Sequence, residues 1–299
     1  MVVQLPKIAV VGDAMLDVEI RGEWDGVCPE NRAVNLFRGR DLALYPGGAA
    51  NVASMLAADP NIEVDLITIG SSGNQWAAGT NWIASMIEGL MPPGVRTLWF
   101  GDGSPPLKVR GMFGERVVSR IDSEVLVERT ERTMVLTTLA EVAGGYDGVI
   151  FSDYRKGTIS LVDEPDVQAI IRNGRVSVVD SKRPEYGLWH GATALCPNHH
   201  EAVAIFGIDD PAVIQRVCGT EAVYITRGDR PVLLSYVGET EELPVRVIDD
   251  PYVIGAGDAF CVGLLLALID GCGYALAGQR AVSFCHEYVS RTPRREMFT

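Results

Sequence analysis

The sequence has few basic residues and no long apolar run, and these shortages exclude several classes of protein. Lysine and arginine number 26 against 39 aspartates and glutamates, so the formal net charge is -13. A surface this acidic repels phosphate backbones and anionic lipids, so we expect neither nucleic acid nor a membrane as partner. The longest apolar run, residues 260–269, is about half of the ~20 residues that a membrane helix needs. The N-terminal segment lacks the basic start of a signal peptide, and we expect a cytoplasmic protein.

Cysteine and histidine are also scarce, and neither forms a chemically informative pattern. None of the six cysteines has C-x-x-C spacing, and we expect buried apolar thiols in a reducing compartment. The four histidines show no metal-ligand spacing, and the adjacent His199 and His200 point in different directions. The motifs G-x-x-x-x-G-K-[ST], G-x-G-x-x-G, H-E-x-x-H and G-x-S-x-G are absent. The chemistry must therefore come from other motifs.

Short apolar strands alternate with helical patterns along the 299 residues. Hydrophobic residues make up 47% of the chain and charged residues 22%, which is enough for a large core. The predicted strands are 7–11, 64–69, 148–151, 176–179 and 223–226. The predicted helices are 49–58, 76–87, 130–143, 201–206 and 259–269. This pattern indicates an α/β fold whose mainly parallel sheet is covered on both faces, with ligands bound beyond the C-terminal ends of the strands.

Two segments interrupt the alternation and predict a small β lid. Residues 17–45 are too long for an ordinary loop, and residues 106–122 have a hairpin pattern with its turn near Phe113 and Gly114. In the second segment Lys108 and Arg110 flank a valine, so on a strand both cations share one face. No repeat or linker divides the chain. We expect one domain, residues 1–299, with a lid.

The strongest local motif is Ile254-Gly255-Ala256-Gly257-Asp258, which runs directly into an apolar helix. Small residues at a helix start leave backbone N–H groups bare. Together with the positive end of the helix dipole, those groups form a site for a phosphate. Asp258 would lie beside that anion. The alternative is a simple turn in which Asp258 caps the helix.

Two further motifs combine glycine, amide and carboxylate groups near the N-terminus. Gly47 and Gly48 allow the backbone to approach a ligand, and Asn51 lies one turn into the following helix. Asp13 and Asp17 follow the first strand, where carboxylates can accept hydrogen bonds from the hydroxyl groups of a polyol. A glycine-rich helix entry and a solvated turn are the corresponding alternatives.

At these positions the chain resembles the ribokinase-like (PfkB) carbohydrate kinase family. Three motifs lie in family order: Gly-Gly-x-x-x-Asn ending at Asn51, Pro-Asn-His-His-Glu ending at Glu201, and Gly-Ala-Gly-Asp ending at Asp258. Within the family the chain is most similar to the D-glycero-β-D-manno-heptose-7-phosphate 1-kinase group, over residues 12–17, 152–157, 180–182 and 191–198. The resemblance implies a three-layer α/β/α sandwich with a mainly parallel central sheet and a small β lid.

The resemblance also implies a site that uses ATP and Mg²⁺. Asp258 would be the general base that takes the proton from the sugar hydroxyl. Gly255, Ala256 and Gly257 would form the anion hole for the transferring phosphoryl group. The implied acceptor-binding residues are Asp13, Asp17, Gly47, Gly48, Asn51, Lys108 and Arg110. The implied nucleotide-binding residues are Asp180, Lys182, Asn198, Thr226, Arg227 and Gly228. Asn198 and Glu201 would hold magnesium, mainly through water.

These roles lead to an expected function with two alternatives. We expect an ATP-dependent kinase of a sugar or sugar phosphate, with the anomeric position of a heptose 7-phosphate as first candidate. The alternatives are a simple-sugar or nucleoside kinase of the same fold and, in another class, a retired kinase that binds ligand and regulates a partner. Lid strands in this family often pair, so a homodimer through the lid is expected. Residues 252–254 are Tyr-Val-Ile where the family usually has a pair such as Asp-Thr, which argues against activation by a monovalent cation.

Overall fold

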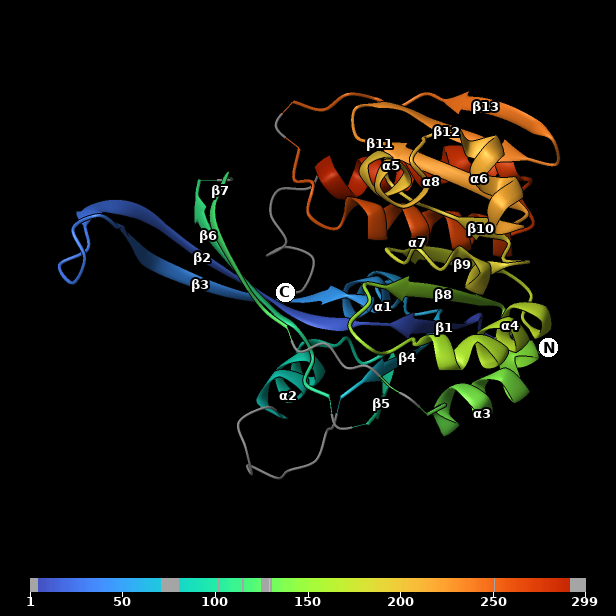
Figure 1. Cartoon of the computed structure of the whole chain (residues 1–299), viewed down its shortest axis with the longest axis horizontal. Helices are drawn as coiled ribbons and strands as arrows, with labels where there is room; N and C mark the ends of the chain where they lie inside the picture. Colours follow the sequence, from blue (N-terminus) through green and yellow to red (C-terminus); the bar gives the residue numbers. More distant parts are fainter. Residues whose placement is uncertain are drawn as a thin grey trace.

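A mainly parallel sheet of nine strands forms the centre of the molecule (Figure 1). The computed structural model describes residues 5–70, 81–101, 103–114, 116–124, 129, 131–249 and 251–290. In sheet order the strands are β13 (Glu239–Leu243), β12 (Arg230–Tyr236), β11 (Ala222–Arg227), β10 (Ala194–Leu195), β9 (Ser177–Ser181), β8 (Gly148–Asp153), β1 (Lys7–Gly12), β4 (Glu63–Ile69) and β5 (Val95–Phe100). The β11–β12 and β12–β13 pairs are antiparallel and the others are parallel.

Helices cover both faces of this sheet, which confirms the expected three-layer α/β/α arrangement. On one face lie α1 (Ala49–Leu56), α2 (Asn81–Leu90), α7 (Ala256–Ile269) and α8 (Tyr274–Ser290). On the other lie α3 (Met134–Val142), α4 (Glu164–Asn173), α5 (His199–Phe206) and α6 (Pro211–Cys218). Short 3₁₀ turns occur at η1 (Ala143–Gly145), η2 (Leu161–Asp163) and η3 (Tyr186–Trp189).

Strand β1 shows why this sequence needs both helical layers. Successive side chains of a strand point to opposite faces. Ile8 and Val10 belong to the core cluster with α1 and α7, whereas Ala9 and Val11 belong to the cluster with α3 and α4. All four are fully buried. A strand that is apolar on both faces is stable only when both faces are covered.

A second sheet projects from one end of the main sheet and forms the expected lid (Figure 1). Its order is β3 (Asn35–Gly48), β2 (Ala14–Val27), β6 (Leu107–Phe113) and β7 (Arg116–Ser123). The β2–β3 and β6–β7 pairs are antiparallel, and β2 pairs with β6 in parallel. The predicted hairpin is thus confirmed. Strands β2 and β3 run further toward the core than predicted, so the lid is continuous with the chain that enters α1.

Several predicted boundaries differ from those in the structure. Helix α7 begins at Ala256 instead of residue 259, so the glycine-rich motif forms its first turn. Helix α3 begins at Met134 instead of residue 130, because the Thr133 side chain caps it by accepting from the Val135 N–H. Helix α5 begins two residues before its predicted start, and α1 ends two residues before its predicted end. Residues 76–80 of the predicted helix 76–87 lie outside the described residues.

The structure also tests the expectations about the cysteines and about membrane helices. Cys196, Cys218 and Cys261 are buried as expected, but Cys28, Cys272 and Cys285 are partly exposed. All six are free thiols. Over the described ranges, every helix is too short or too polar to cross a lipid bilayer.

Candidate active site

A polar cavity of about 330 Å³ opens between the lid and the C-terminal ends of the central strands. Its wall includes residues that follow β8, β9 and β10, the first turn of α7, and residues of the lid strands. The lining residues are Asp17, Gly48, Lys108, Arg110, Arg120, Tyr154, Asp180, Lys182, Cys196, Asn198, Glu201, Thr226, Val253, Ile254, Gly255, Ala256, Gly257 and Asp258. The sequence motifs therefore meet where a parallel sheet usually places its ligands.

The charges in this cavity differ from those of the chain as a whole. Its described wall carries four cations, Lys108, Arg110, Arg120 and Lys182, and four carboxylates, Asp17, Asp180, Glu201 and Asp258. Local neutrality in a chain of net charge -13 means that basic groups are concentrated at this site. Such a cavity can accept an anionic ligand that the overall field would repel.

The first turn of α7 presents backbone N–H groups to the cavity. Gly255 is the N-terminal cap residue, with φ 83° and no capping side chain. A Cβ atom at this position would lie 2.5 Å from the Tyr288 hydroxyl, so glycine is required for both conformation and space. Asp258 is the third residue of the helix, and the alternative of an Asp-capped turn is wrong. The N–H groups of a helix start have no acceptor within the helix. That of Ala256 donates to the Val253 carbonyl at 3.2 Å, and Gly257 and Asp258 lie in the cavity wall.

Two donors hold the carboxylate of Asp258. The Asn51 amide donates to its Oδ2 at 2.6 Å, and the Tyr154 hydroxyl donates to its Oδ1 at 3.2 Å. Asp258 is 5% exposed and Asn51 is fully buried. Asn51 thus contacts Asp258, the candidate base, from the protein interior, because Asn51 is not among the residues that line the cavity. Tyr154 was missed as a site residue, although it lies in the stretch 152–157 that supports the resemblance.

Asp13 occupies a different place from the one that a sugar-binding role suggests. Its carboxylate accepts from the backbone N–H groups of Tyr154 and Lys156 at 2.9 Å and of Thr158 at 3.0 Å. The side chain is 1% exposed, and this burial raises the pKa of Asp13 above its usual value. Asp13 lies behind the cavity wall, where it organises the loop after β8.

Asp17 lines the cavity and pairs with one of the predicted lid cations. Its Oδ1 lies 3.0 Å from Nη1 of Arg110, and both side chains are largely buried. A Cβ atom on Gly47 would lie 2.9 Å from this carboxylate, so Gly47 provides room for Asp17 without lining the cavity itself. Gly48 does line the cavity, with φ 55°. Its own Cβ atom would lie 2.4 Å from the Asp13 carbonyl oxygen.

The remaining lid cations are Lys108 and the unpredicted Arg120. Burial lowers the pKa of Lys108, and its Nζ lies 5.1 Å from the centroid of the Tyr154 ring. Arg120 is directly opposite Arg110 in the β6–β7 register, where like charges destabilise a hairpin unless they are compensated. Asp122 accepts from Arg120 at 2.7 and 2.8 Å, and Asp17 compensates Arg110. The sequence held a signal for Arg120: once the two strands of the predicted hairpin are paired across the turn, Arg120 lies opposite Arg110.

A carboxylate cluster lies on the other side of the cavity. Asn198 and Glu201 form a capping box at the start of α5, in which each side chain accepts from the other residue's N–H, at 2.9 and 3.0 Å. Lys182 Nζ lies 3.3 Å from Glu201. Burial and the nearby Glu201 carboxylate raise the pKa of Asp180 to about 8. Within the described residues, no three histidine, cysteine or acidic side chains are grouped as in a protein-only metal site.

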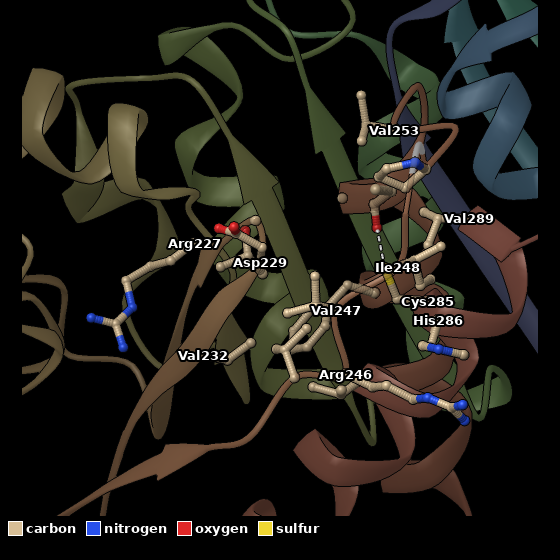
Figure 2. A pocket seen from close by; sticks show the side chains of 18 residues that line it. Arg227, Asp229, Val232, Arg246, Val247, Ile248, Val253, Cys285, His286 and Val289 are labelled. Carbon is tan, nitrogen blue, oxygen red and sulfur yellow. Dashed lines mark hydrogen bonds between the residues drawn. The ribbon is translucent and has the colours of Figure 1, made fainter.

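An apolar pocket of about 210 Å³ adjoins the polar cavity (Figure 2). The pocket and the cavity have four lining residues in common, Thr226, Val253, Ala256 and Gly257. The start of α7 therefore forms the wall between the two spaces. The other lining residues are Arg227, Gly228, Asp229, Val232, Val245, Arg246, Val247, Ile248, Pro251, Phe260, Val282, Cys285, His286 and Val289. Figure 2 shows the guanidinium group of Arg227 directed away from the apolar side chains. This group donates to the Pro231 carbonyl at 2.6 Å, so only the remainder of Arg227 lines the pocket.

Comparison with known proteins agrees with this arrangement. Residues 163–292 match the family described as pfkB family carbohydrate kinase. The chain carries a PfkB carbohydrate kinase domain. It is similar to bifunctional protein HldE of Azorhizobium caulinodans, at 29% identity over 90% of the chain, and to that of Trichlorobacter lovleyi, at 32% identity over 90% of the chain. The chain spans 57% and 55% of those two proteins, little more than half of their length.

The fold of the PfkB domain is also found among solved structures. Arabidopsis thaliana ribokinase, solved as a complex with ribose and ATP, superposes with a TM-score of 0.71 and 15% identity. The alignment covers 98% of this chain and 95% of the ribokinase. At this identity the likeness establishes the ribokinase-like fold, which confirms the fold class expected from the sequence.

Proposed function

We propose that the protein is an ATP-dependent sugar kinase that transfers the γ-phosphoryl group to a hydroxyl of a sugar phosphate. Our specific candidate is a heptose 7-phosphate, phosphorylated at the anomeric position. One observation carries the proposal: an apolar pocket and a charged cavity meet at the uncapped start of α7, beside Asp258. The match of residues 163–292 to the PfkB carbohydrate kinases and the motifs that resemble those of the heptose kinase group support it.

The two cavities match the two substrates. The apolar pocket suits a flat nucleobase, with Thr226 and Gly228 at its edge. The phosphates would then lie across the start of α7, where Gly255, Ala256 and Gly257 form the anion hole. The acceptor would occupy the polar cavity, with one hydroxyl at Asp258.

The transfer needs a base and charge stabilisation in this geometry. Asp258 takes the proton of the acceptor hydroxyl as that oxygen bonds to the γ-phosphorus. The bond from the γ-phosphorus to the bridging oxygen breaks, and ADP leaves. Because the transition state of phosphoryl transfer is loose, positioning and stabilisation of charge account for most of the catalysis. The N–H groups at the start of α7 and Lys182 provide that stabilisation.

The oxygen donors of the cavity fit magnesium bound mainly through water. Mg²⁺ is usually held by one or two carboxylates together with waters and substrate phosphates. Asn198, Glu201 and Asp180 supply such donors on the nucleotide side of the cavity. When bound, the ion would neutralise charge on the phosphates of ATP.

The lid supplies the groups for the acceptor. Arg110 is held by Asp17 in a largely buried pair, whereas the pair of Arg120 with Asp122 is half exposed and can open to an incoming anion. We therefore assign Lys108 and Arg120 to the phosphate of the acceptor. Asp17 would accept hydrogen bonds from sugar hydroxyls. The lid also exposes apolar side chains, among them Leu42 and Ile121, and we propose that they pair two copies of the chain into a homodimer.

An assay of ADP release over a panel of acceptors tests the proposed function. The panel contains a heptose 7-phosphate, hexose phosphates, unphosphorylated sugars and nucleosides, each with ATP and MgCl₂. The highest kcat/KM is expected for a sugar phosphate. A preference for an unphosphorylated sugar or a nucleoside would contradict the phosphorylated acceptor. ATP binding with no turnover on any acceptor would favour a ligand-binding regulator, and the inactive Asp258→Asn variant supplies the baseline.

A further inference from the structure

Tyr154 contacts three separate groups of the polar cavity. It is the first residue after β8, and its hydroxyl donates to Oδ1 of Asp258 at 3.2 Å. The Nζ of Lys182 lies 3.9 Å from the centroid of its ring, and that of Lys108 lies 5.1 Å away. Cations within about 6 Å of an aromatic face are attracted to it. One side chain therefore links the candidate base, a cation after β9 and a cation of the lid.

The backbone of Tyr154 is held by a buried anion. Its N–H donates to Oδ2 of Asp13 at 2.9 Å, and the N–H of Lys156 donates to the same oxygen at 2.9 Å. Between them Arg155 has φ 61°, a left-handed conformation that an L-residue adopts only at a cost. Asp13 is nearly inaccessible, so these bonds lie away from competing water. The loop thus has one fixed shape, and Tyr154 has one fixed place.

We propose that Tyr154 is a positioning residue for phosphoryl transfer. Its hydroxyl orients the carboxylate of Asp258, and its ring fixes Lys182 on the nucleotide side and Lys108 on the acceptor side. This inference rests on the proposed kinase function. Asn51 holds the other oxygen of Asp258 at 2.6 Å, so two donors define the plane of the carboxylate. A carboxylate oxygen can accept two hydrogen bonds, so an acceptor hydroxyl can share Oδ1 with Tyr154.

Two substitutions separate the hydroxyl from the ring. Tyr154→Phe keeps the ring, so kcat should fall by about tenfold because a hydrogen bond to a charged group is lost, while both KM values stay within about twofold. Tyr154→Leu removes both parts. It should show the same loss in kcat and, in addition, at least about a fivefold weaker binding of both substrates, because neither lysine is held over a ring.

Tyr146→Phe is the matched control. The hydroxyl of Tyr146 donates to the buried Asp65 at 2.6 Å, and neither residue lines the polar cavity. This variant loses a similar Tyr–Asp hydrogen bond and should keep wild-type kinetics. Thermal melting measures the fraction of folded protein in each variant. If the activity of Tyr154→Phe falls only as much as its folded fraction, Tyr154 has a structural role and the proposal is overturned.

A binding measurement tests the role of Tyr154 separately from the proposed function. Calorimetry gives the affinity of each variant for a non-hydrolysable ATP analogue with Mg²⁺. The measurement needs no acceptor. If no sugar is phosphorylated, the proposed function fails, but the analogue should still bind at least about fivefold more weakly to Tyr154→Leu than to Tyr154→Phe. Equal affinities would overturn the role of the ring, and an unchanged kcat in Tyr154→Phe would overturn the role of the hydroxyl.

Discussion

The two cavities beside the start of α7 differ in how the chain builds them. The residues of the apolar pocket all fall between positions 226 and 289, on consecutive elements of the C-terminal part. The residues of the polar cavity range from Asp17 to Asp258 and come from the lid, from the C-terminal ends of β8 to β11 and the segments that follow them, and from the starts of α5 and α7. The apolar pocket, which we propose for the nucleotide, is thus a nearly local structure, whereas the polar cavity, which we propose for the acceptor, exists only when distant segments meet. Substitutions on the lid should therefore change the acceptor side alone.

Asp258 lies where the two sides meet, and its removal should have the largest effect. Asp258→Asn should lower kcat by about 10²–10⁴-fold, the range typical of a lost general base. The affinity for the ATP analogue should remain, since the apolar pocket is unchanged. Steady-state kinetics together with calorimetry check this. Turnover within a few-fold of wild type would remove Asp258 from the role of base.

The lid cations should affect only the acceptor. Lys108→Ala combined with Arg120→Ala should raise the KM for a sugar phosphate by at least about tenfold, because each charge-assisted hydrogen bond contributes about 1.5–3 kcal/mol. The KM for ATP should barely change. The matched control is Arg38→Ala with Arg40→Ala, which removes two exposed cations from the same lid. If both double variants behave alike, the phosphate assignment is wrong.

The apolar pocket should show the reverse selectivity. Val282→Phe places a ring in a space of about 210 Å³. The KM for ATP should rise about tenfold, a loss of about 1.4 kcal/mol in binding free energy, while the KM for the acceptor stays unchanged. Val217→Phe on the exposed face of α6 is the control. An equal rise in both KM values would show that the two sides are not separable.

Glu201 should give a smaller effect, on magnesium. Glutamine can still accept from the Asn198 N–H, so Glu201→Gln keeps the capping box but removes the charge. The MgCl₂ concentration for half-maximal activity should rise several-fold, because an outer acceptor for the waters of the ion is weakened. A magnesium titration checks this. Identical titrations would leave Glu201 with the capping role alone.

The smallest effect is expected from monovalent cations. Residues 252–254 supply no carboxylate, and the Tyr252 hydroxyl donates to Glu19 at 2.7 Å. Replacing KCl by tetramethylammonium chloride at equal ionic strength should change kcat by less than about twofold, because residues 252–254 offer no carboxylate to such a cation. A strong requirement for potassium would point to a binding site elsewhere.

Local pattern alone predicted the α/β fold class and the glycine-rich entry to α7. Apolar runs that are buried on both faces placed five of the central strands, and the glycine-rich motif placed the entry to α7, although the predicted helix began three residues late. The errors lay at helix ends, where capping by Thr133 and Gly255 decides the boundary, and in the central strands β5, β10, β12 and β13, which were not predicted. The grouping of Asp17, Lys108 and Asp258 at one cavity also followed from motifs that end at the same edge of a sheet.

The sequence by itself therefore determined the α/β fold class and the glycine-rich entry to α7, since both depend on neighbouring residues. Only the tertiary structure decided the partner of each charge. Asn51 and Asp258 are 207 positions apart, yet share a hydrogen bond. Asp13 turned out to hold a loop, and Arg110 to pair with Asp17. Hydrogen bonds and ion pairs depend on distances of a few ångströms, and the spacing of residues along a chain does not encode those distances between segments that meet only on folding.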